Sequence, residues 1–346
     1  MAKSFLYERA VSSEPLFATI RQSNNMFSLV VSASLKPNLV TSVLSQLAPR
    51  WLSVTPRLWS SSKVIPPFLH AQIVNSLLVE QQNLKFIDVR APEVYSKGHI
   101  PNAVNIHDIF TYLSVSDAQD LQGERNKLTS TFENLFQQAG INGDEIVITY
   151  EDNLKTLYGA SCRGFFLLKL LGHPNVAVLN GGFEAWVKHG LPTSTTVPDI
   201  TKGKFKAQWV DSMWSDRDDV AMAIKDGSAV LLDVRDTDEW KGTDNLPSLR
   251  KGRLPGAIHI HWHDFMKTGE DGMTYFREPE EVREMCTAKG LTPESKVILY
   301  CFSGVRASNA FIALKEAGFS NVTNYIGSWY EWSSDSDLEI DSGKLE

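Results

Sequence analysis

This 346-residue chain has no long apolar run and only three cysteines, and acidic residues are scarce near its N-terminus. No apolar stretch approaches the roughly 20 residues that a membrane-spanning helix needs. Its three cysteines are too few and too scattered for a disulfide framework or a zinc site, which favours a reducing compartment and a free thiol. The formal net charge of −7 argues against nucleic acid as a partner. A globular protein remains, long enough for two ordinary domains.

The N-terminal segment, residues 1–62, is rich in serine and poor in acidic residues. Up to Lys63 it has seven basic residues against two acidic ones, a charge of +5, so the remainder of the chain carries −12. Apolar residues recur at helical spacing over 39–47, which favours an amphipathic helix there. We therefore expect a transit peptide with a mitochondrial (matrix) address, because arginines are interleaved with apolar residues. A disordered leader without a targeting function is the alternative for this segment, and a plastid or cytoplasmic location is the alternative to the matrix. A start at Met26 would remove the two acidic residues.

From Val64 onward, helix-like and strand-like segments alternate, which indicates an α/β fold with a parallel sheet covered on both faces. The first half predicts helices over Phe68–Val79, Leu128–Ala139 and Gly164–Leu171, and strands over Leu84–Arg90, Glu145–Tyr150 and Val176–Leu179. Residues 194–210, rich in threonine, lysine and proline, predict a linker.

The same pattern returns in the second half of the chain. Val297–Tyr300 matches Val147–Tyr150 at an offset of 150 residues, whereas the motif Gly327–Trp332 matches Gly181–Trp186 at an offset of 146. Matched blocks in one order indicate a tandem duplication of one α/β unit. The change of offset predicts four extra residues in the first copy, between its central strand and the following helix.

The second copy places Cys301 between an apolar strand and the start of a helix. Backbone amides that converge at a helix N-terminus, together with the helix dipole, suit an anion and favour thiolate over thiol. Arg306 adds a cation that stays charged at neutral pH. These features predict that Cys301 is a nucleophile aimed at an anionic substrate. Glu151 stands at the matching place in the first copy, so only the second copy can perform thiol chemistry.

The paired motifs resemble the rhodanese superfamily, in particular its two-domain thiosulfate and 3-mercaptopyruvate sulfurtransferases. The resemblance rests on Asp-Val-Arg followed by Gly-His-Ile-Pro in the first copy and by Gly-Arg-Leu-Pro-Gly in the second. It rests further on the six-residue loop Cys301–Arg306 and on Gly-Ser-Trp-Tyr-Glu-Trp at 327–332. It implies two tandem rhodanese domains, each a parallel five-stranded sheet with helices on both faces. The inactive domain would cover residues 64–193 and the catalytic domain residues 211–346.

The resemblance also implies a reaction. The loop cysteine takes a sulfane sulfur from a small-molecule donor, becomes a persulfide, and passes the sulfur to cyanide or a thiol, without a metal or an organic cofactor. A thioredoxin-type reductant is a further expected partner. The substrate-binding residues predicted in this way are Phe302, Ser303, Gly304, Val305, Arg306, Arg250 and Arg253, and the loop-supporting residues are Asp233 and Arg235.

Two departures from the family pattern bear on the donor. Family loops carry Gly or Arg at the second position and Thr at the sixth, where this chain has Phe302 and Arg306. The donor-binding arginine usually lies four residues after the Asp-x-Arg arginine, and that position is Glu239 here. We therefore expect Arg306 to bind the donor, with Arg250 or Arg253 behind it. A loop cation suits a compact dianion, which favours thiosulfate over 3-mercaptopyruvate.

Two other functions remain as alternatives. Cys-dependent phosphatases related to this fold hold phosphate in a Cys-x5-Arg loop, and the loop from Cys301 to Arg306 is one residue shorter. The shorter loop gives a tighter cavity, better matched to a sulfur atom. A tandem scaffold without enzymatic activity is disfavoured because the cysteine is kept in one copy while its counterpart is replaced.

Three alternating histidines, His259, His261 and His263, resemble a metal-binding comb on one face of an expected strand. No cysteine or carboxylate cluster completes a coordination shell in the sequence, so no metal is expected. The other two cysteines, Cys162 and Cys286, fall in or beside helical segments and are expected to pack rather than react.

Overall fold

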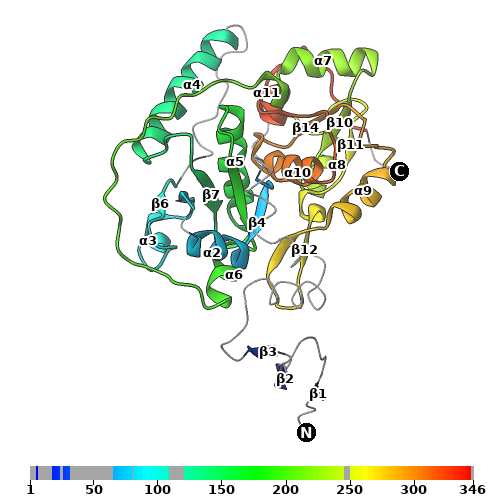
Figure 1. Cartoon of the computed structure of the whole chain (residues 1–346). Coiled ribbons are helices and arrows are strands. Elements are labelled where there is room, and N and C mark those ends of the chain that lie inside the picture. Colours follow the sequence, from blue (N-terminus) through cyan, green and yellow to red (C-terminus); the bar gives the residue numbers. More distant parts are fainter. Residues whose placement is uncertain are drawn as a thin grey trace. The chain divides into compact units, whose positions relative to one another are not determined.

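The computed structural model describes residues 5–6, 18–23, 26–31, 65–80, 82–107, 109, 121–244 and 250–343 (Figure 1). The chain divides into two compact units, Met1–Ser61 and Ser62–Glu346. In the first unit, β1 (Phe5–Leu6), β2 (Ala18–Ser23) and β3 (Met26–Val31) form an antiparallel sheet, which the leader interpretation did not anticipate. The amphipathic helix expected over 39–47 lies outside the described residues, and the transit peptide stays a prediction.

The first copy of the repeat forms a five-stranded parallel sheet in the order β4-β8-β7-β5-β6. Its strands are β4 (Phe68–His70), β5 (Leu84–Asp88), β6 (Val104–Asn105), β7 (Ile146–Tyr150) and β8 (Val176–Asn180). Its helices are α2 (Ala71–Val79), α3 (Pro92–Tyr95), α4 (Leu121–Gln138), the 3₁₀ turn η3 (Thr156–Tyr158), α5 (Ala160–Leu170) and α6 (Gly182–Lys188). All of β8 is buried, as expected of a parallel strand covered on both faces.

The second copy repeats this order as β9-β15-β14-β10-β11, again with five parallel strands. These strands are β9 (Trp214–Ser215), β10 (Val230–Asp233), β11 (Ile258–His259), β14 (Val297–Tyr300) and β15 (Val322–Tyr325). Strands β12 (Met266–Thr268) and β13 (Thr274–Phe276) form a separate two-stranded antiparallel sheet.

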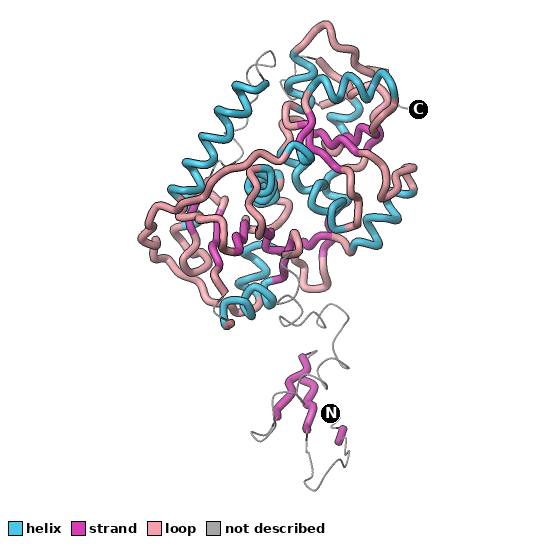
Figure 2. The backbone as a smooth tube through the Cα atoms, turned by 45° about the horizontal axis from the view of Figure 1, so that its top comes forward, coloured by secondary structure: helices cyan, strands magenta, loops and turns pink. Residues whose placement is uncertain are grey.

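The helical elements of the second copy lie around this sheet. Figure 2 shows the strands of the second unit, Ser62–Glu346, with helices around them. They are η4 (Asp211–Met213), α7 (Arg217–Asp226), α8 (Thr237–Lys241), η5 (Trp262–Phe265), α9 (Pro279–Thr287), α10 (Val305–Glu316) and α11 (Ser328–Ser334). The predicted fold, two tandem units with five-stranded parallel sheets, is confirmed. None of the helices in the described part of the chain is long and apolar enough to cross a membrane.

Three element boundaries differ from the prediction. The segment expected as one helix over Phe68–Val79 begins with strand β4, because its first residues pair with β8 at the sheet edge. Helix α4 begins seven residues earlier than expected, at Leu121. The interval from β7 to α5 is five residues longer than the interval from β14 to α10, rather than four. These element boundaries depend on strand pairing and helix caps, which the pattern of apolar residues does not show.

The segment predicted as a linker is bonded to the first copy for part of its length. The N–H groups of Gly203 and Phe205 donate to Gln137 O at 2.7 Å and to Ile141 O at 3.0 Å. A Cβ on Gly203 would lie 1.9 Å from Ile141 O, so only glycine permits this approach. Phe205 is buried. This stretch is therefore a packed strap rather than a free connection.

The two copies meet through α5 and α10, the helices that follow their central strands. Phe166 of α5 and Phe311 of α10 pack edge to face, with ring centroids 5.1 Å apart. Asn309 Nδ2 of α10 lies 3.7 Å from the Cys162 sulfur of α5. Each helix begins beside the residue that follows its central strand, Glu151 or Cys301. The contact therefore brings the first copy to the loop that contains Cys301.

Candidate active site

The predicted strand, turn and helix around Cys301 are confirmed. Cys301 directly follows β14, and α10 begins at Val305 after Gly304. Gly304 has a left-handed φ of 75°, and a Cβ there would lie 3.0 Å from Ile326 Cα, so glycine is required at this cap. The cysteine is only 1% exposed. A reactant therefore reaches its sulfur over the residues that flank the loop.

Hydrogen bonds tie the loop backbone to the start of α11. The N–H of Cys301 donates to Ser328 Oγ at 3.2 Å, and its carbonyl accepts from Trp329 N at 3.0 Å. The Phe302 carbonyl accepts from Tyr330 N at 2.9 Å. Ser328 has a left-handed φ of 52°, an uncommon conformation that its hydroxyl bonds over-determine. The motif after β15 thus fixes the backbone of Cys301 and Phe302.

The carbonyl of Gly304 receives three donors from different elements. Ser308 Oγ and Asn324 Nδ2 each donate to it at 3.0 Å. Arg163 Nη1 donates at 3.2 Å, and this residue belongs to α5 of the first copy. The first copy, which has Glu151 at the place of Cys301, therefore supplies a cation to the Cys301 loop.

Arg163 is the residue at this site that sequence reasoning missed. It is fully buried, and its Nε and Nη2 have no hydrogen-bond partner in the described part of the chain. Burial lowers the pKa of Arg163 to about 10, with the charge of Cys301 acting in the opposite direction, so the group is a cation at neutral pH. The available signal was an arginine separated only by Gly164 from the apolar run Phe165–Leu168, since a buried charge needs a partner.

The predicted loop-supporting residues, Asp233 and Arg235, form a buried clamp after β10. Arg235 Nη2 donates to Asp233 Oδ2 at 2.6 Å and to Gly252 O at 2.8 Å. Its guanidinium lies over the Trp329 ring, 4.6 Å from the centroid. The clamp thereby joins the end of β10 to the helix that anchors Cys301. The first copy repeats it, with Arg90 Nη2 bonded to Asp88 at 2.6 Å and to Gly98 O at 2.7 Å.

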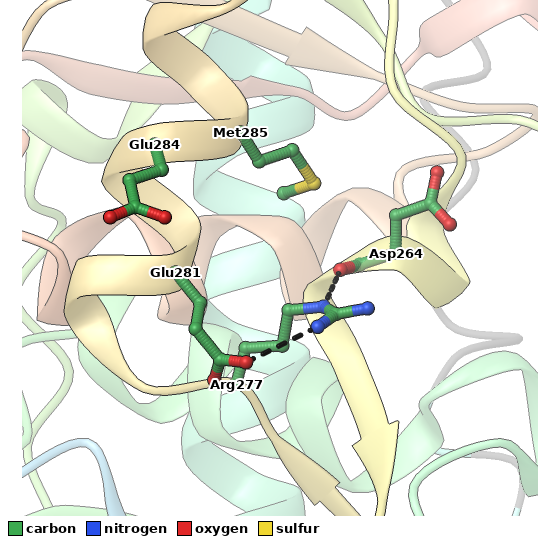
Figure 3. Close-up of a pocket in the computed structure, with 5 residues that line it drawn as sticks. All are labelled: Asp264, Arg277, Glu281, Glu284 and Met285. Atoms are coloured by element: carbon green, nitrogen blue, oxygen red, sulfur yellow. Dashed lines mark hydrogen bonds and ion pairs between the residues drawn. The ribbon is translucent and has the colours of Figure 1, made fainter.

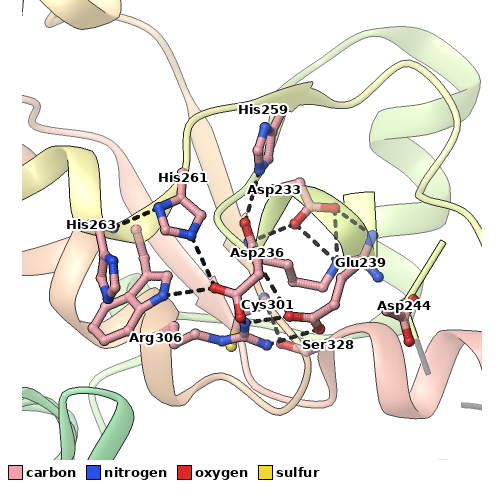
Figure 4. Close-up of polar contacts among 12 residues, drawn as sticks. Asp233, Asp236, Glu239, Asp244, His259, His261, His263, Cys301, Arg306 and Ser328 are labelled. Carbon is pink, nitrogen blue, oxygen red and sulfur yellow. Dashed lines mark hydrogen bonds and ion pairs between the residues drawn. The ribbon is translucent and has the colours of Figure 1, made fainter. Parts of the chain in front are cut away.

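The two departures from the family pattern, Arg306 and Glu239, meet in one ion pair (Figure 4). Arg306 Nη2 donates to Glu239 Oε1 at 2.9 Å, its Nη1 contacts Glu239 Oε2, and Nη1 also lies 3.3 Å from Asp236 Oδ2. Burial disfavours the charged guanidinium, but the bonds to Glu239 and the charge of Cys301 outweigh it and raise the pKa of Arg306. Arg306 was expected to be a donor cation, and in the structure it links the loop helix to α8.

The other two predicted cations, Arg250 and Arg253, are also engaged. Arg250 donates to the carbonyls of Leu338 at 2.7 Å and Trp332 at 3.0 Å, and it also bonds those of Ser333 and Asp335. Arg253 pairs with Asp341 at 2.8 Å, and its guanidinium lies 4.7 Å from the Trp240 ring centroid. Both therefore hold the C-terminal segment in place. Their expected binding of the sulfur donor stays a prediction.

The remaining predicted substrate-binding residues lie in the loop itself. Phe302 and Ser303 are partly exposed, whereas Val305 is buried as the first residue of α10. The Phe302 ring lies 5.8 Å from the ring of Tyr330, which is 56% exposed. From the first copy, Tyr158 places its ring 5.9 Å from the Arg306 guanidinium. Aromatic groups thus border the loop on both sides.

The three histidines do not lie along one strand as the sequence suggested. His259 is in β11, His261 caps η5, and His263 lies within η5. His261 Nε2 donates to Asp236 Oδ1 at 3.0 Å, and its Nδ1 accepts from the backbone N–H of His263 at 3.3 Å. The bond from His261 and then the charge of Arg306 hold the pKa of Asp236 below its usual range. Among the described residues no cluster of potential ligands could hold a metal ion.

The other two cysteines and the pocket in Figure 3 are separate from the Cys301 loop. Cys162 and Cys286 are buried, and burial raises the pKa of both thiols. The pocket in Figure 3 is lined by Asp264, Arg277, Glu281, Glu284 and Met285, without a nucleophile. Arg277 there is bonded to Glu281 and to the Asp264 carbonyl. The Cys301 loop is therefore the candidate active site.

Glu151 occupies in the first copy the place that Cys301 occupies in the second. It follows β7, and its carbonyl accepts from Phe183 N at 2.8 Å, as the Cys301 carbonyl accepts from Trp329 N. Its side chain turns back onto the start of α5, where Ser161 N and Oγ donate to Oε1 at 3.1 and 2.6 Å. The first copy thus fills its own helix N-terminus with a carboxyl group.

The hydrogen bonds around Glu151 indicate that its carboxyl group is protonated and therefore neutral. The Thr156 hydroxyl lies 2.7 Å from Asn153 O and 3.0 Å from Glu151 Oε2, but it has one proton. Because the Asn153 carbonyl cannot donate, both contacts are satisfied when Glu151 carries the second proton. In agreement, burial raises the pKa of Glu151 to about 8, although the bonds from Ser161 and Thr156 oppose this.

Glu151→Gln is expected to stabilise the protein at alkaline pH. The folded-state pKa of Glu151, about 8, exceeds the value of 4.5 expected in the unfolded chain. The contribution of its carboxyl group to the free energy of unfolding is therefore full below pH 4.5 and is lost as the pH rises to 8. The loss by pH 8 is on the order of 4 kcal/mol, and glutamine removes it. Urea unfolding of both proteins between pH 4.5 and 8.5 measures the effect.

The matched control is Glu145→Gln in the same domain. Its buried carboxylate accepts from three backbone N–H groups, those of Asn142, Gly143 and Asp144. This substitution should destabilise the protein near neutral pH, because an amide accepts fewer hydrogen bonds than a carboxylate. Equal pH profiles for wild type and Glu151→Gln would contradict a neutral Glu151.

The structure thus shows a duplicated parallel α/β unit with a cysteine directly after the central strand of its second copy. A family model for the rhodanese-like domain matches residues 71–189 and 216–335. The chain belongs to the rhodanese family and is a sulfurtransferase.

Curated relatives support this family. The chain is 31% identical over 288 residues to the sulfur carrier protein TtuD of Thermus thermophilus, covering 77% of this chain and 95% of the relative. It is 33% identical over 251 residues to a putative thiosulfate sulfurtransferase of Haloferax volcanii, covering 70% and 82%. It is 26% identical over 259 residues to a 3-mercaptopyruvate sulfurtransferase of Escherichia coli, covering 74% and 88%.

Among solved structures, the 3-mercaptopyruvate sulfotransferase SseA of Escherichia coli shares the fold. The TM-score is 0.63 at 23% identity, with 77% of this chain and 99% of that chain covered.

Proposed function

We propose that the protein transfers a sulfane sulfur from thiosulfate to a thiophilic acceptor, cyanide or a thiol, through a persulfide on Cys301. The observation that carries the proposal is the loop of Cys301 itself, anchored to α11 and bonded to Arg163 at Gly304. A thiol at a helix N-terminus with a buried cation nearby is an environment that favours thiolate.

In the first half-reaction the Cys301 thiolate attacks the outer sulfur of thiosulfate. A bond forms between Sγ and that sulfur, the sulfur–sulfur bond of thiosulfate breaks, and sulfite leaves with the electron pair. Negative charge is present on the donor and on the leaving group throughout. The unpaired N–H groups of Arg163 and the amides at the start of α10 suit that charge.

Arg163, rather than Arg306, supports an anionic donor. Arg306 is bonded to Glu239 and Asp236, so its charge is already compensated by carboxylates. Arg163 has no carboxylate partner among the described residues, and two of its nitrogens are unbonded. Arg306 then acts on the loop by holding the first turn of α10 against α8.

A second candidate donor is 3-mercaptopyruvate, because one relative is named a sulfurtransferase for that compound. Thiosulfate is preferred here because the cation at the loop is a single buried guanidinium, which suits a compact anion better than a longer keto acid. With either donor the sulfur passes through Cys301.

Steady-state kinetics with cyanide as acceptor test the proposal. Thiosulfate is expected to give the larger kcat/KM, with thiocyanate as product, and p-nitrophenyl phosphate is expected to give no turnover. A larger kcat/KM with 3-mercaptopyruvate would replace the donor while keeping the mechanism. Phosphate release without thiocyanate formation would replace the mechanism.

A further inference from the structure

The ion pair of Arg306 at the end of the Cys301 loop contains one carboxylate more than it needs (Figure 4). Arg306 pairs with both oxygens of Glu239, and its Nη1 also lies 3.3 Å from Asp236 Oδ2. One guanidinium against two carboxylates gives this group a net charge of −1. Although burial opposes it, the bonds to Glu239 and then the charge of Cys301 raise the pKa of Arg306. The group and the nucleophile therefore act on each other through charge.

His261 connects this group to solvent. Its Nε2 donates to Asp236 Oδ1 at 3.0 Å, and Trp262 Nε1 donates to the same oxygen at 3.0 Å. Its Nδ1 accepts from the backbone N–H of His263 at 3.3 Å, so the imidazole is neutral in this arrangement. The side chain of His261 is 24% exposed, which gives solvent access to the ring. A proton on Nδ1 would replace the bond from His263 and bring the net charge of the whole group from −1 to zero.

The neighbouring histidines are less suited to this role. The ring of His259 donates from Nε2 to the Arg235 carbonyl at 2.8 Å, and burial lowers the pKa of His259. Burial and then the charge of His261 lower the pKa of His263. Of the three, His261 is the one that pairs with a carboxylate among the described residues. The other charged or titratable groups around His261 and its neighbours are Glu239, Arg306, Asp233, Arg235, Lys155 and Asp264.

We propose that His261 is a positioning residue which, through Asp236, sets the charge that an anionic reactant meets at the Cys301 loop. While His261 is neutral, the excess carboxylate opposes an anion that approaches Cys301. Protonation of His261 cancels this excess, so the buried cation Arg163 attracts the anion unopposed. Histidine side chains change charge between about pH 5 and 8, so reaction with an anion is linked to proton uptake in that range. The inference rests on the Cys301 nucleophile of the proposed function.

The test compares two alkylating reagents of similar size, the anion iodoacetate and neutral iodoacetamide, on the full chain. Both react with the Cys301 thiolate, so the ratio of their rates does not depend on the fraction of thiolate. Mass spectrometry of the peptide with Cys301 measures each rate. In wild type the ratio of iodoacetate to iodoacetamide is expected to rise about threefold between about pH 8 and about pH 6. The rise should shrink in about 0.5 M salt, which screens charges that are partly exposed.

Three variants assign this pH dependence to residues. His261→Gln should keep the low ratio at every pH, because its amide can donate to Asp236 but takes up no proton. Asp236→Asn removes the excess charge, so its ratio should be high already at about pH 8 and nearly constant with pH. The matched control is His263→Gln, in the same 3₁₀ element but without a carboxylate partner, and it should keep the wild-type rise.

Loading with thiosulfate, recorded as sulfite release, connects the inference to the proposed function. Asp236→Asn is expected to load about threefold faster than wild type at about pH 8, a gain that damage to the fold would not produce. A wild-type rise of the alkylation ratio in His261→Gln, or a constant ratio in wild type, would overturn the role of His261. If the ratio behaves as expected but wild type releases no sulfite at any pH, the thiosulfate reaction is wrong and the role of His261 stands.

Discussion

Cys301→Ser is expected to abolish thiocyanate formation from thiosulfate and cyanide, with a loss of about 10⁴-fold or more in kcat/KM. A serine hydroxyl is not ionised at neutral pH and cannot hold a transferable sulfane sulfur. The loop should keep its shape, because its anchors are the backbone of residue 301, which serine retains. Thermal unfolding is therefore expected to change little.

The matched control is Cys286→Ala, at a buried thiol in α9 whose pKa is raised by burial. It should keep near wild-type turnover, apart from a modest loss of stability from the missing sulfur. Mass spectrometry after thiosulfate treatment should find one added sulfur in wild type and in Cys286→Ala, and none in Cys301→Ser. Turnover of Cys301→Ser close to wild type would sink the mechanism.

Arg163→Met is expected to lower kcat/KM for thiosulfate by on the order of 10²-fold, the effect of removing one charged donor from a preorganised anion site. Methionine keeps much of the buried volume but neither the charge nor the bond to Gly304. The loss should appear in KM for thiosulfate and in the rate of sulfite release. The readout that separates charge from packing is the rate of Cys301 alkylation by the anion iodoacetate relative to the rate with neutral iodoacetamide, a ratio that should fall.

Two variants complete this experiment. Arg163→Lys keeps a positive charge and should recover part of the activity and of the alkylation ratio. Arg125→Met removes another arginine that reaches the second copy, where it pairs with Asp211 at 2.9 Å and lies 5.9 Å from the Trp214 ring. Arg125 is not bonded to the Cys301 loop, so this variant should leave the alkylation ratio unchanged. If Cys301 in Arg163→Met is alkylated as in wild type and the KM for thiosulfate is unchanged, Arg163 does not act as a cation at the loop.

Much of the fold could be predicted from the sequence because it depends on local patterns repeated twice. Apolar strands followed by amphipathic helices predict parallel sheets, and matching blocks predict that the two sheets share one strand order, as they do. The short edge strand Phe68–His70 escaped prediction because three residues carry too little pattern. Its state is set by pairing with β8, a contact distant in the chain.

The candidate site was predictable only in part, for a similar reason. The place of Cys301, the glycine cap and the Asp233–Arg235 clamp follow from residues close together in sequence. The partners of Arg306 do not, since Glu239 is 67 residues away and could have been an unrelated surface charge. The histidines were misplaced because their spacing of two suggests a strand, whereas the chain turns into η5 after His259.

What the sequence by itself determined is the duplicated α/β architecture and the family, since the order of the motifs suffices for both. What only the tertiary structure decided is the electrostatics around the sulfur. Arg306 is compensated by Glu239, whereas Arg163 reaches the loop from the other copy, 141 residues before Gly304. Charges act through space and through burial, and neither their distances nor their exposure can be read from the order of residues.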